Sequence, residues 1–175
     1  FGRVALSSTI WSLVENGNGI DVDDMFLKKI KSMQNDLNEM AKIIKTIPDV
    51  KVICGDARKL EVNTNSIDLI VTSPPYVNAL DYYRAHMYNM LWLGMDFDLF
   101  RKHEIGGHSH FIVNRFRLLS EYLGDMLRSM TEMNRVLKKD KLCVIVVGNS
   151  SLEYELIESH KFFAEMGGKI GFKLI

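Results

Sequence analysis

Strand-like runs of apolar residues alternate with helix-like stretches along this chain. Residues 67–72 (IDLIVT) and 142–147 (LCVIVV) are almost continuously apolar, which is the pattern of strands buried on both faces. Between them, from 116 to 137, apolar residues recur at three- and four-residue steps, as in an amphipathic helix. This alternation predicts an α/β domain with a mainly parallel sheet flanked by helices.

The same periodicities predict elements in the first part of the chain. A long amphipathic helix is expected over residues 21–46 and is ended by Pro48. A short strand follows over residues 51–54, and residues 79–94 have a helical pattern. Residues 95–114 are predicted to be a loop.

The last part of the chain is expected to add one helix and one strand. Ser150 and Glu153 have the spacing of a capping box, which predicts a helix over residues 152–166. The glycines at 167–168 are expected to end that helix before a final strand over residues 170–175.

Length and composition favour one domain. The chain has 175 residues, of which 47% are apolar, and this is enough for one core. We expect a single domain with a helical lead-in over residues 1–48 and an α/β core over residues 49–175. The sequence does not begin with Met and ends on a strand-like run, so we expect it to be a fragment.

The charge balance gives no global sign of a nucleic-acid partner, because 22 basic and 22 acidic residues cancel. Any such contact needs a local patch. The most basic stretch could follow a DNA backbone or be a solvated loop; it contains Arg101, Lys102, His103, His108, His110, Arg115 and Arg117. Its histidines lack the further ligands of a tetrahedral site, so no metal is expected.

Cysteine usage and hydropathy indicate the compartment. Cys54 and Cys143 each lie in an apolar run, where a thiol behaves as a small buried hydrophobe, so a reducing cytoplasm is expected. No stretch approaches the roughly 18 apolar residues of a membrane span.

The tetrapeptide Ser73, Pro74, Pro75 and Tyr76, hereafter the SPPY loop, directly follows the first buried run. An exocyclic base amine is a poor nucleophile because its lone pair is delocalised into the ring. A serine oxygen and a backbone carbonyl can accept its two hydrogens, and two prolines hold such carbonyls rigidly. A following aromatic ring can stack on an extruded base while a methyl group approaches the nitrogen.

The run from Cys54-Gly55-Asp56-Ala57-Arg58 to the SPPY loop closely resembles the amino-group DNA methyltransferases, which have an Asp/Asn/Ser-Pro-Pro-aromatic catalytic loop. The later stretch over residues 132–147 resembles the helix and strand beyond that loop. The resemblance covers residues 51–175 and implies a Rossmann-like methyltransferase fold. It also implies S-adenosylmethionine as cofactor and double-stranded DNA with a flipped target base as substrate.

The resemblance assigns roles to individual residues. Ser73, Pro74, Pro75 and Tyr76 are the expected catalytic residues. Asp56 is expected to bind the cofactor's adenine, with Ala57 and Ser73 beside it. The expected substrate-binding residues are Asn78, Tyr82, Tyr83 and Arg84, for which an ordinary helix start is the alternative. Because carboxyl ends of parallel strands share one edge, we expect Asp56, the SPPY loop and residues 148–149 to meet there.

Several functional alternatives stay open. Serine at the first loop position resembles enzymes acting on N4 of cytosine more than those acting on N6 of adenine. The family's Phe-x-Gly-x-Gly loop, which holds the methionine end of the cofactor, is not present in this sequence, and Gly17 and Gly19 are interpreted as a plain loop. One alternative is a tRNA or rRNA amino-group methyltransferase. Another is a catalytically degenerate domain that binds nucleic acid or a protein partner. A restriction or specificity partner is conceivable for this family.

Overall fold

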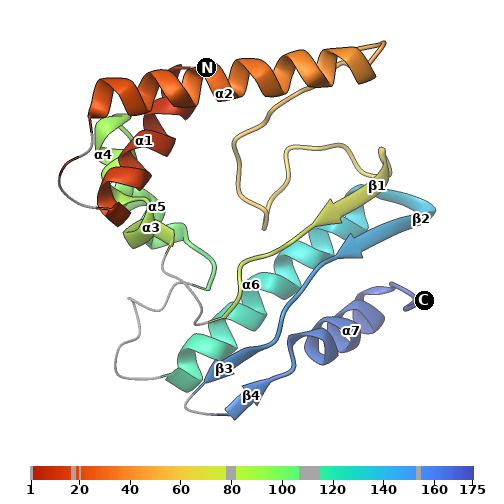
Figure 1. Ribbon diagram of the computed structural model, residues 1–175. Helices are drawn as coiled ribbons and strands as arrows, with labels where there is room; N and C mark the ends of the chain where they lie inside the picture. The colour runs from red at the N-terminus through yellow and green to blue at the C-terminus, as the bar shows by residue number, and fades with distance from the viewer. Residues whose placement is uncertain (1, 17–18, 20, 78–81, 107–114, 153–154) are drawn as a thin grey trace. The chain divides into compact units, whose positions relative to one another are not determined.

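The computed structural model describes residues 2–16, 19, 21–77, 82–106, 115–152 and 155–175 (Figure 1). Its backbone contacts divide into two compact units. One unit comprises residues 1–52 and 83–100, and the other comprises residues 53–82 and 101–175. The prediction of a single domain with a boundary near residue 48 stays a prediction.

The first unit is helical. It contains α1 (Gly2–Asn16), α2 (Val22–Ile43) and α4 (Met87–Trp92), and α1 packs against both of the others. The predicted long helix is confirmed: Asp21 caps α2 by accepting the Asp24 N–H at 3.0 Å. The apolar stripe of an amphipathic helix usually faces a core, but none of the residues of α2 is buried.

The second unit is built on a parallel β–α–β connection. Strands β1 (Ile67–Thr72) and β2 (Leu137–Ile145) pair in parallel, and α6 (Arg115–Val136) connects to β2 directly. A small antiparallel hairpin, β3 (Ser150–Leu152) and β4 (Glu155–Ile157), leads into α7 (Ser159–Ile170). Parallel pairing is therefore confirmed for two strands, whereas the complete Rossmann sheet is not seen among the described residues.

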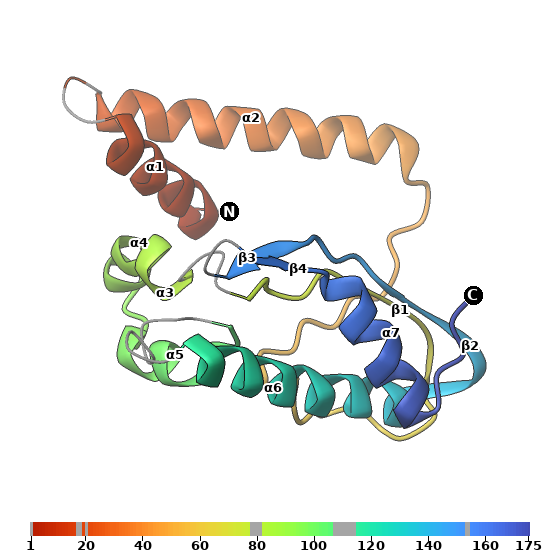
Figure 2. The same ribbon diagram turned by 90° about the horizontal axis from the view of Figure 1, so that it is seen from below.

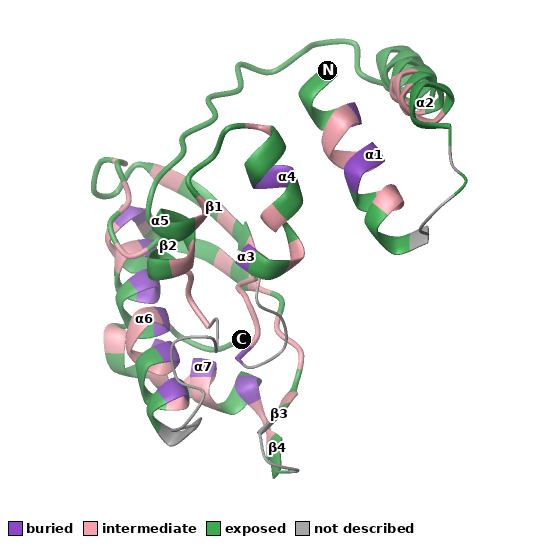
Figure 3. Cartoon of the chain, turned by 90° about the vertical axis from the view of Figure 1, so that its left-hand side faces the viewer, coloured by how far each residue is buried: buried purple, intermediate pink, exposed green. Residues whose placement is uncertain are grey.

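The core of this unit lies between the sheet and the two long helices. Figure 2 shows α6 and α7 side by side, and Figure 3 marks the buried residues of α6 in purple. Met126, Met130 and Met133 of α6 are core residues. The buried cluster consists of Val77, Leu118, Tyr122, Met126, Met130, Met133 and Phe163.

The two faces of the sheet differ in burial. Ile70, Cys143 and Ile145 pack against the helical core, whereas the alternate residues Leu69 and Val144 are exposed. The expectation of strands buried on both faces is thus wrong for the described chain. The helices α6 and α7 contact only the face to which Ile70 and Cys143 belong.

Residues 51–54 do not form the predicted strand. A strand exists only where its backbone pairs with a neighbour, and this run makes no ladder in the described structure. Val52 is 90% exposed and Cys54 is exposed as well, so Cys54 is not a buried hydrophobe. Cys143 on β2 is half-buried, and burial raises its thiol pKa.

Two predictions between residues 79 and 114 need correction. The expected single helix is divided into α3 (Tyr82–Ala85) and α4 by His86, and residues 78–81 lie outside the described chain. The expected loop contains α5 (Phe97–His103), whose first turn is held by Asp96 accepting the Leu99 N–H at 2.9 Å. Residues 107–114 lie outside the described chain.

The predicted capping box is also wrong. Ser150 begins β3 and α7 begins only at Ser159, because pairing with β4 satisfies the Ser150 backbone better than a helix start. Gly167 lies inside α7 and does not end it. Gly171, at φ 104°, ends the helix, and the expected final strand does not form.

A pair of charged residues on α6 anchors the segment that precedes β1. The Glu132 carboxylate accepts the Leu60 N–H at 2.8 Å and binds the Arg135 guanidinium at 2.7 Å. Arg135 in turn donates to the carbonyls of Leu60 and Val62, both at 2.9 Å. These contacts position the start of β1 against the end of α6.

None of the described helices is long and apolar enough to cross a membrane.

The Glu132 anchor predicts a pH-dependent stability. Arg135 and the Leu60 N–H lower the Glu132 pKa from 4.5 to about 2. The stabilisation is therefore complete above the unfolded-state pKa and is lost as pH falls toward the folded value. We expect Glu132→Gln to lower the free energy of unfolding near neutral pH, with a difference from wild type that shrinks on acidification.

Urea unfolding from about pH 6 to about pH 3 measures this difference. Glu121→Gln is the control, because Glu121 forms an exposed pair with Arg117 on the same helix. A Glu132→Gln difference that stays constant across this range would contradict the assignment.

Candidate active site

The SPPY loop begins where β1 ends, beside the chain that leaves β2. The parallel ladder extends beyond the Thr72–Ile145 pair, because the Val146 N–H donates to the Thr72 carbonyl at 2.9 Å. In a regular parallel ladder, the next donor to the Val146 carbonyl would be the N–H of residue 74. That residue is Pro74, which has no N–H.

The Ser73 hydroxyl replaces the missing donor. Its Oγ donates to the Val146 carbonyl oxygen at 3.1 Å, and the Ser73 side chain is exposed. The hydroxyl proton is therefore committed to the backbone of the neighbouring chain, while the lone pairs of Oγ remain available. Ser73 is set up to accept a hydrogen bond from a ligand rather than to donate one.

The two proline carbonyls of the loop have different surroundings. The Tyr122 hydroxyl on α6 donates to the Pro75 carbonyl at 2.9 Å. Burial and the neighbouring Tyr76 raise the Tyr122 pKa to about 12, so its hydroxyl stays protonated. Within the described chain the Pro74 carbonyl accepts no hydrogen bond, so its lone pairs are available for a ligand.

Two glycines allow close approach to the SPPY loop. A Cβ on Gly148 would lie 3.4 Å from Cζ of Tyr76, so the Tyr76 ring packs against the backbone that follows β2. A Cβ on Gly106 would lie 3.2 Å from the Tyr122 ring and 3.4 Å from the Tyr76 carbonyl. Gly106 also has φ 83°, which a residue with a side chain rarely adopts.

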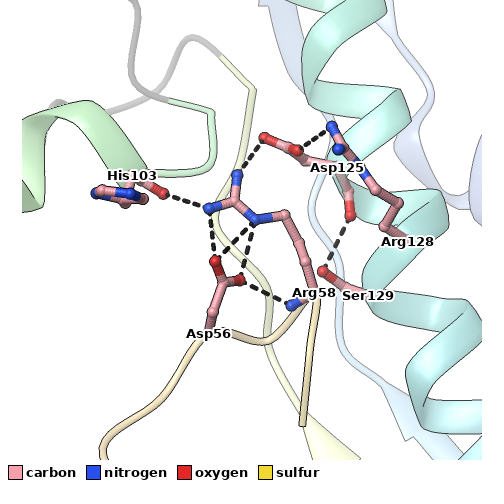
Figure 4. Close-up of polar contacts among 6 residues, drawn as sticks. All are labelled: Asp56, Arg58, His103, Asp125, Arg128 and Ser129. Atoms are coloured by element: carbon pink, nitrogen blue, oxygen red, sulfur yellow. Dashed lines mark hydrogen bonds and ion pairs between the residues drawn. The ribbon is translucent and has the colours of Figure 1, made fainter.

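Asp56 lies in a network centred on Arg58 (Figure 4). One carboxylate oxygen accepts the backbone N–H of Arg58 at 2.8 Å and its Nε at 2.9 Å, and the other accepts a terminal guanidinium nitrogen at 2.8 Å. Arg58 also donates to Asp125 on α6 at 3.0 Å and to the His103 carbonyl at 3.3 Å. Asp125 further binds Arg128 at 2.8 Å.

This network orients Asp56 and keeps it ionised. Hydrogen bonding and charge from Arg58 hold the Asp56 pKa below its usual value, and the same contacts raise the pKa of Arg58. The Asp56 side chain is 42% exposed, and exposed ion pairs contribute only about 0–1 kcal/mol to stability. The main effect of the network is therefore geometric: Arg58 fixes the orientation of a carboxylate that stays partly exposed.

The structure brings together part of the predicted edge. The SPPY loop meets Gly148, and Asp56 is connected to the same helix as the loop, because Asp125 lies one turn after Tyr122 on α6. Asn149 instead contacts His160 at 3.4 Å. The roles predicted for Asp56, Ala57, Ser73, Pro74, Pro75 and Tyr76 stay predictions.

The roles predicted for the substrate-binding residues stay predictions. Asn78 lies outside the described chain. The Tyr82 backbone N–H donates to Glu104 at 2.5 Å. Tyr83 is buried and Arg84 exposed, and both belong to the helical unit.

The predicted basic stretch is only partly described. Arg101, Lys102 and His103 form the last turn of α5, and Arg117 pairs with Glu121 at 2.9 Å. His108, His110 and the side chain of Arg115 lie outside the described residues.

Sequence reasoning missed Arg58, Tyr122 and Asp125. The two-residue spacing of Asp56 and Arg58 was a usable signal, because such neighbours can pair across a tight turn. Tyr122 and Asp125 lie three residues apart on one helix face, but no local pattern reveals which loops that face contacts.

Sequence comparison relates the chain to DNA methylases. A DNA methylase family matches residues 67–175, which is more than half of the chain and includes the SPPY loop, α6 and β2. The Type II methyltransferase M.BsoBI of Geobacillus stearothermophilus is 26% identical over 148 residues. That match covers 82% of this chain and 28% of the relative, so the chain spans less than a third of the relative's length.

No solved structure matches the chain significantly. The family match extends over the strand that carries the SPPY loop and over the helix and strand that hold it in place. The chain belongs to the N6/N4 DNA methylase family.

Proposed function

We propose that the chain carries the catalytic loop of an S-adenosylmethionine-dependent enzyme that methylates an exocyclic amino group of a flipped base in double-stranded DNA. The observation that carries the proposal is the Ser73 hydroxyl, which donates to the Val146 carbonyl and presents its lone pairs as an acceptor. The family match supports methylation of an amino group in DNA.

The chemistry needs two acceptors on one amine. When Ser73 Oγ and the Pro74 carbonyl each accept one amine hydrogen, the nitrogen lone pair is drawn out of conjugation with the ring. The Tyr76 ring, held against Gly148, offers a face on which the base stacks. Pro74 and Pro75 limit the motion of these groups, so the loop loses little conformational entropy when the base binds.

Asp56 is the residue proposed to hold the cofactor's adenine. Its ionised carboxylate accepts hydrogen bonds and is 42% exposed, so an adenine amine can approach it while Arg58 holds its orientation. Ala57 and Ser73 are proposed to lie beside the cofactor. When bound, S-adenosylmethionine supplies an electrophilic methyl group for direct displacement by the amine.

We propose N4 of cytosine rather than N6 of adenine as the target, because the first residue of the loop is serine. Asn78, Tyr82, Tyr83 and Arg84 remain the proposed contacts to DNA. The proposed setting is a restriction-modification system in the cytoplasm, with a restriction or specificity partner.

Transfer of a labelled methyl group from S-adenosylmethionine tests the proposal. The full-length protein is incubated with DNA and, separately, with tRNA and rRNA, and the products are digested to nucleosides. We expect label in DNA as N4-methylcytosine. Label as N6-methyladenine would overturn the target base, label in RNA alone would overturn the DNA substrate, and no cofactor binding would leave only a degenerate domain.

Substitutions at Ser73 test its dual hydrogen bonding. The residue must donate to Val146 and accept from the amine, which asparagine can also do, whereas an ionised aspartate can only accept. We expect Ser73→Ala and Ser73→Asp to lower kcat by about a hundredfold, and Ser73→Asn to retain more activity than either.

Single-turnover methylation rates measure this order. Ser120→Ala is the control, since Ser120 is an exposed serine that donates to the Arg117 carbonyl on α6. Full activity of Ser73→Asp would contradict the donor role of Ser73.

Arg58 and Arg128 form a matched pair for testing the cofactor role of Asp56. Both bind Asp125, but only Arg58 also binds Asp56. We expect Arg58→Ala to weaken S-adenosylmethionine binding by about tenfold and Arg128→Ala to have little effect, as calorimetry can measure. Equal affinities for the two variants would contradict the orientation of Asp56 by Arg58.

The pH dependence of binding gives a second test of this arrangement. Arg58 lowers the Asp56 pKa, so the wild-type carboxylate stays ionised to lower pH. We expect cofactor binding to be lost at a higher pH in Arg58→Ala than in wild type as the solution is acidified.

A further inference from the structure

The backbone of the SPPY loop has one torsion that its own sequence leaves open. A proline ring fixes φ at Pro74 and Pro75, and a following proline restricts ψ at Ser73 and Pro74. The ψ angle of Pro75 has neither restraint, because the next residue is Tyr76. This angle sets the direction of the Pro75 carbonyl and of the chain entering Tyr76.

Tyr122 supplies the missing restraint. Its hydroxyl donates to the Pro75 carbonyl at 2.9 Å from a side chain that is only 3% exposed. The ring belongs to the buried cluster with Val77 and Met126, so its position is fixed by core packing. The contact joins residues 47 apart in sequence, on a loop and on α6.

The backbone at Gly106 lies close to both Tyr122 and Tyr76. The position of a Cβ on Gly106 lies 3.2 Å from the Tyr122 ring and 3.4 Å from the Tyr76 carbonyl. A side chain at position 106 would therefore press on both the Tyr122 ring and the Tyr76 carbonyl, and glycine leaves them in place.

We propose that Tyr122 is a positioning residue for the methyl transfer: its hydroxyl fixes ψ of Pro75, and thereby the direction of the chain that carries the Tyr76 ring toward the base. The inference rests on the proposed function and adds a residue on α6 to the reaction. Tyr122 touches neither base nor cofactor in this proposal and acts only through the loop.

The substitution Tyr122→Phe tests the role, since it removes the hydroxyl and keeps the ring. We expect kcat to fall by roughly five- to tenfold, with the cofactor Kd unchanged within about twofold. Tyr88→Phe is the control, because Tyr88 is 49% exposed. A purely structural role would instead lower the unfolding midpoint and weaken cofactor binding together with kcat.

A second measurement does not depend on activity. The ¹³C carbonyl chemical shift of Pro75 reports its hydrogen bond directly, and we expect an upfield shift in Tyr122→Phe with the Leu118 and Met126 shifts unchanged. An unchanged Pro75 shift, or an unchanged kcat in a variant of an active enzyme, would overturn the inference. An inactive wild type with the expected Pro75 shift would overturn the proposed function and leave the Tyr122 restraint standing.

Discussion

The parallel pairing of β1 with β2 is the interaction on which the site depends. Because parallel strands end at the same edge, Thr72 and Ile145 stop side by side, and the backbone of Val146 continues the ladder into the SPPY loop. Pro74 interrupts that ladder, and the Ser73 hydroxyl completes it. One backbone carbonyl thus determines how the serine presents its lone pairs.

Helix α6 is the second support. Along its length it holds the Pro75 carbonyl through Tyr122, Arg58 through Asp125, and the segment before β1 through Glu132. These partners come from two segments of the chain, one before β1 and one after it, that share no local sequence signal. A single helix packed by its methionines into the core therefore fixes the relative positions of the loop and of Asp56.

Local sequence patterns predicted several elements correctly. The strand Ile67–Thr72 and the long helix that begins after Asp21 lie where apolar spacing placed them. The patterns failed where a partner decides the outcome: residues 51–54 have strand composition but no paired neighbour, and Ser150 joined a hairpin instead of capping a helix. Likewise, Gly171 rather than Gly167 ended α7, because only Gly171 adopts positive φ.

The sequence by itself determined that a rigid serine–proline–proline–tyrosine turn follows an apolar strand, and with it the family resemblance, because proline restricts φ wherever it occurs. Only the tertiary structure decided which groups that turn meets. The donation from Ser73 to Val146, the hydrogen bond from Tyr122 to Pro75 and the anchoring of Arg58 by Asp125 depend on packing between segments far apart in the chain. Such contacts form when the sheet and α6 bury their apolar faces together. The spacing of neighbouring residues in the sequence does not predict them.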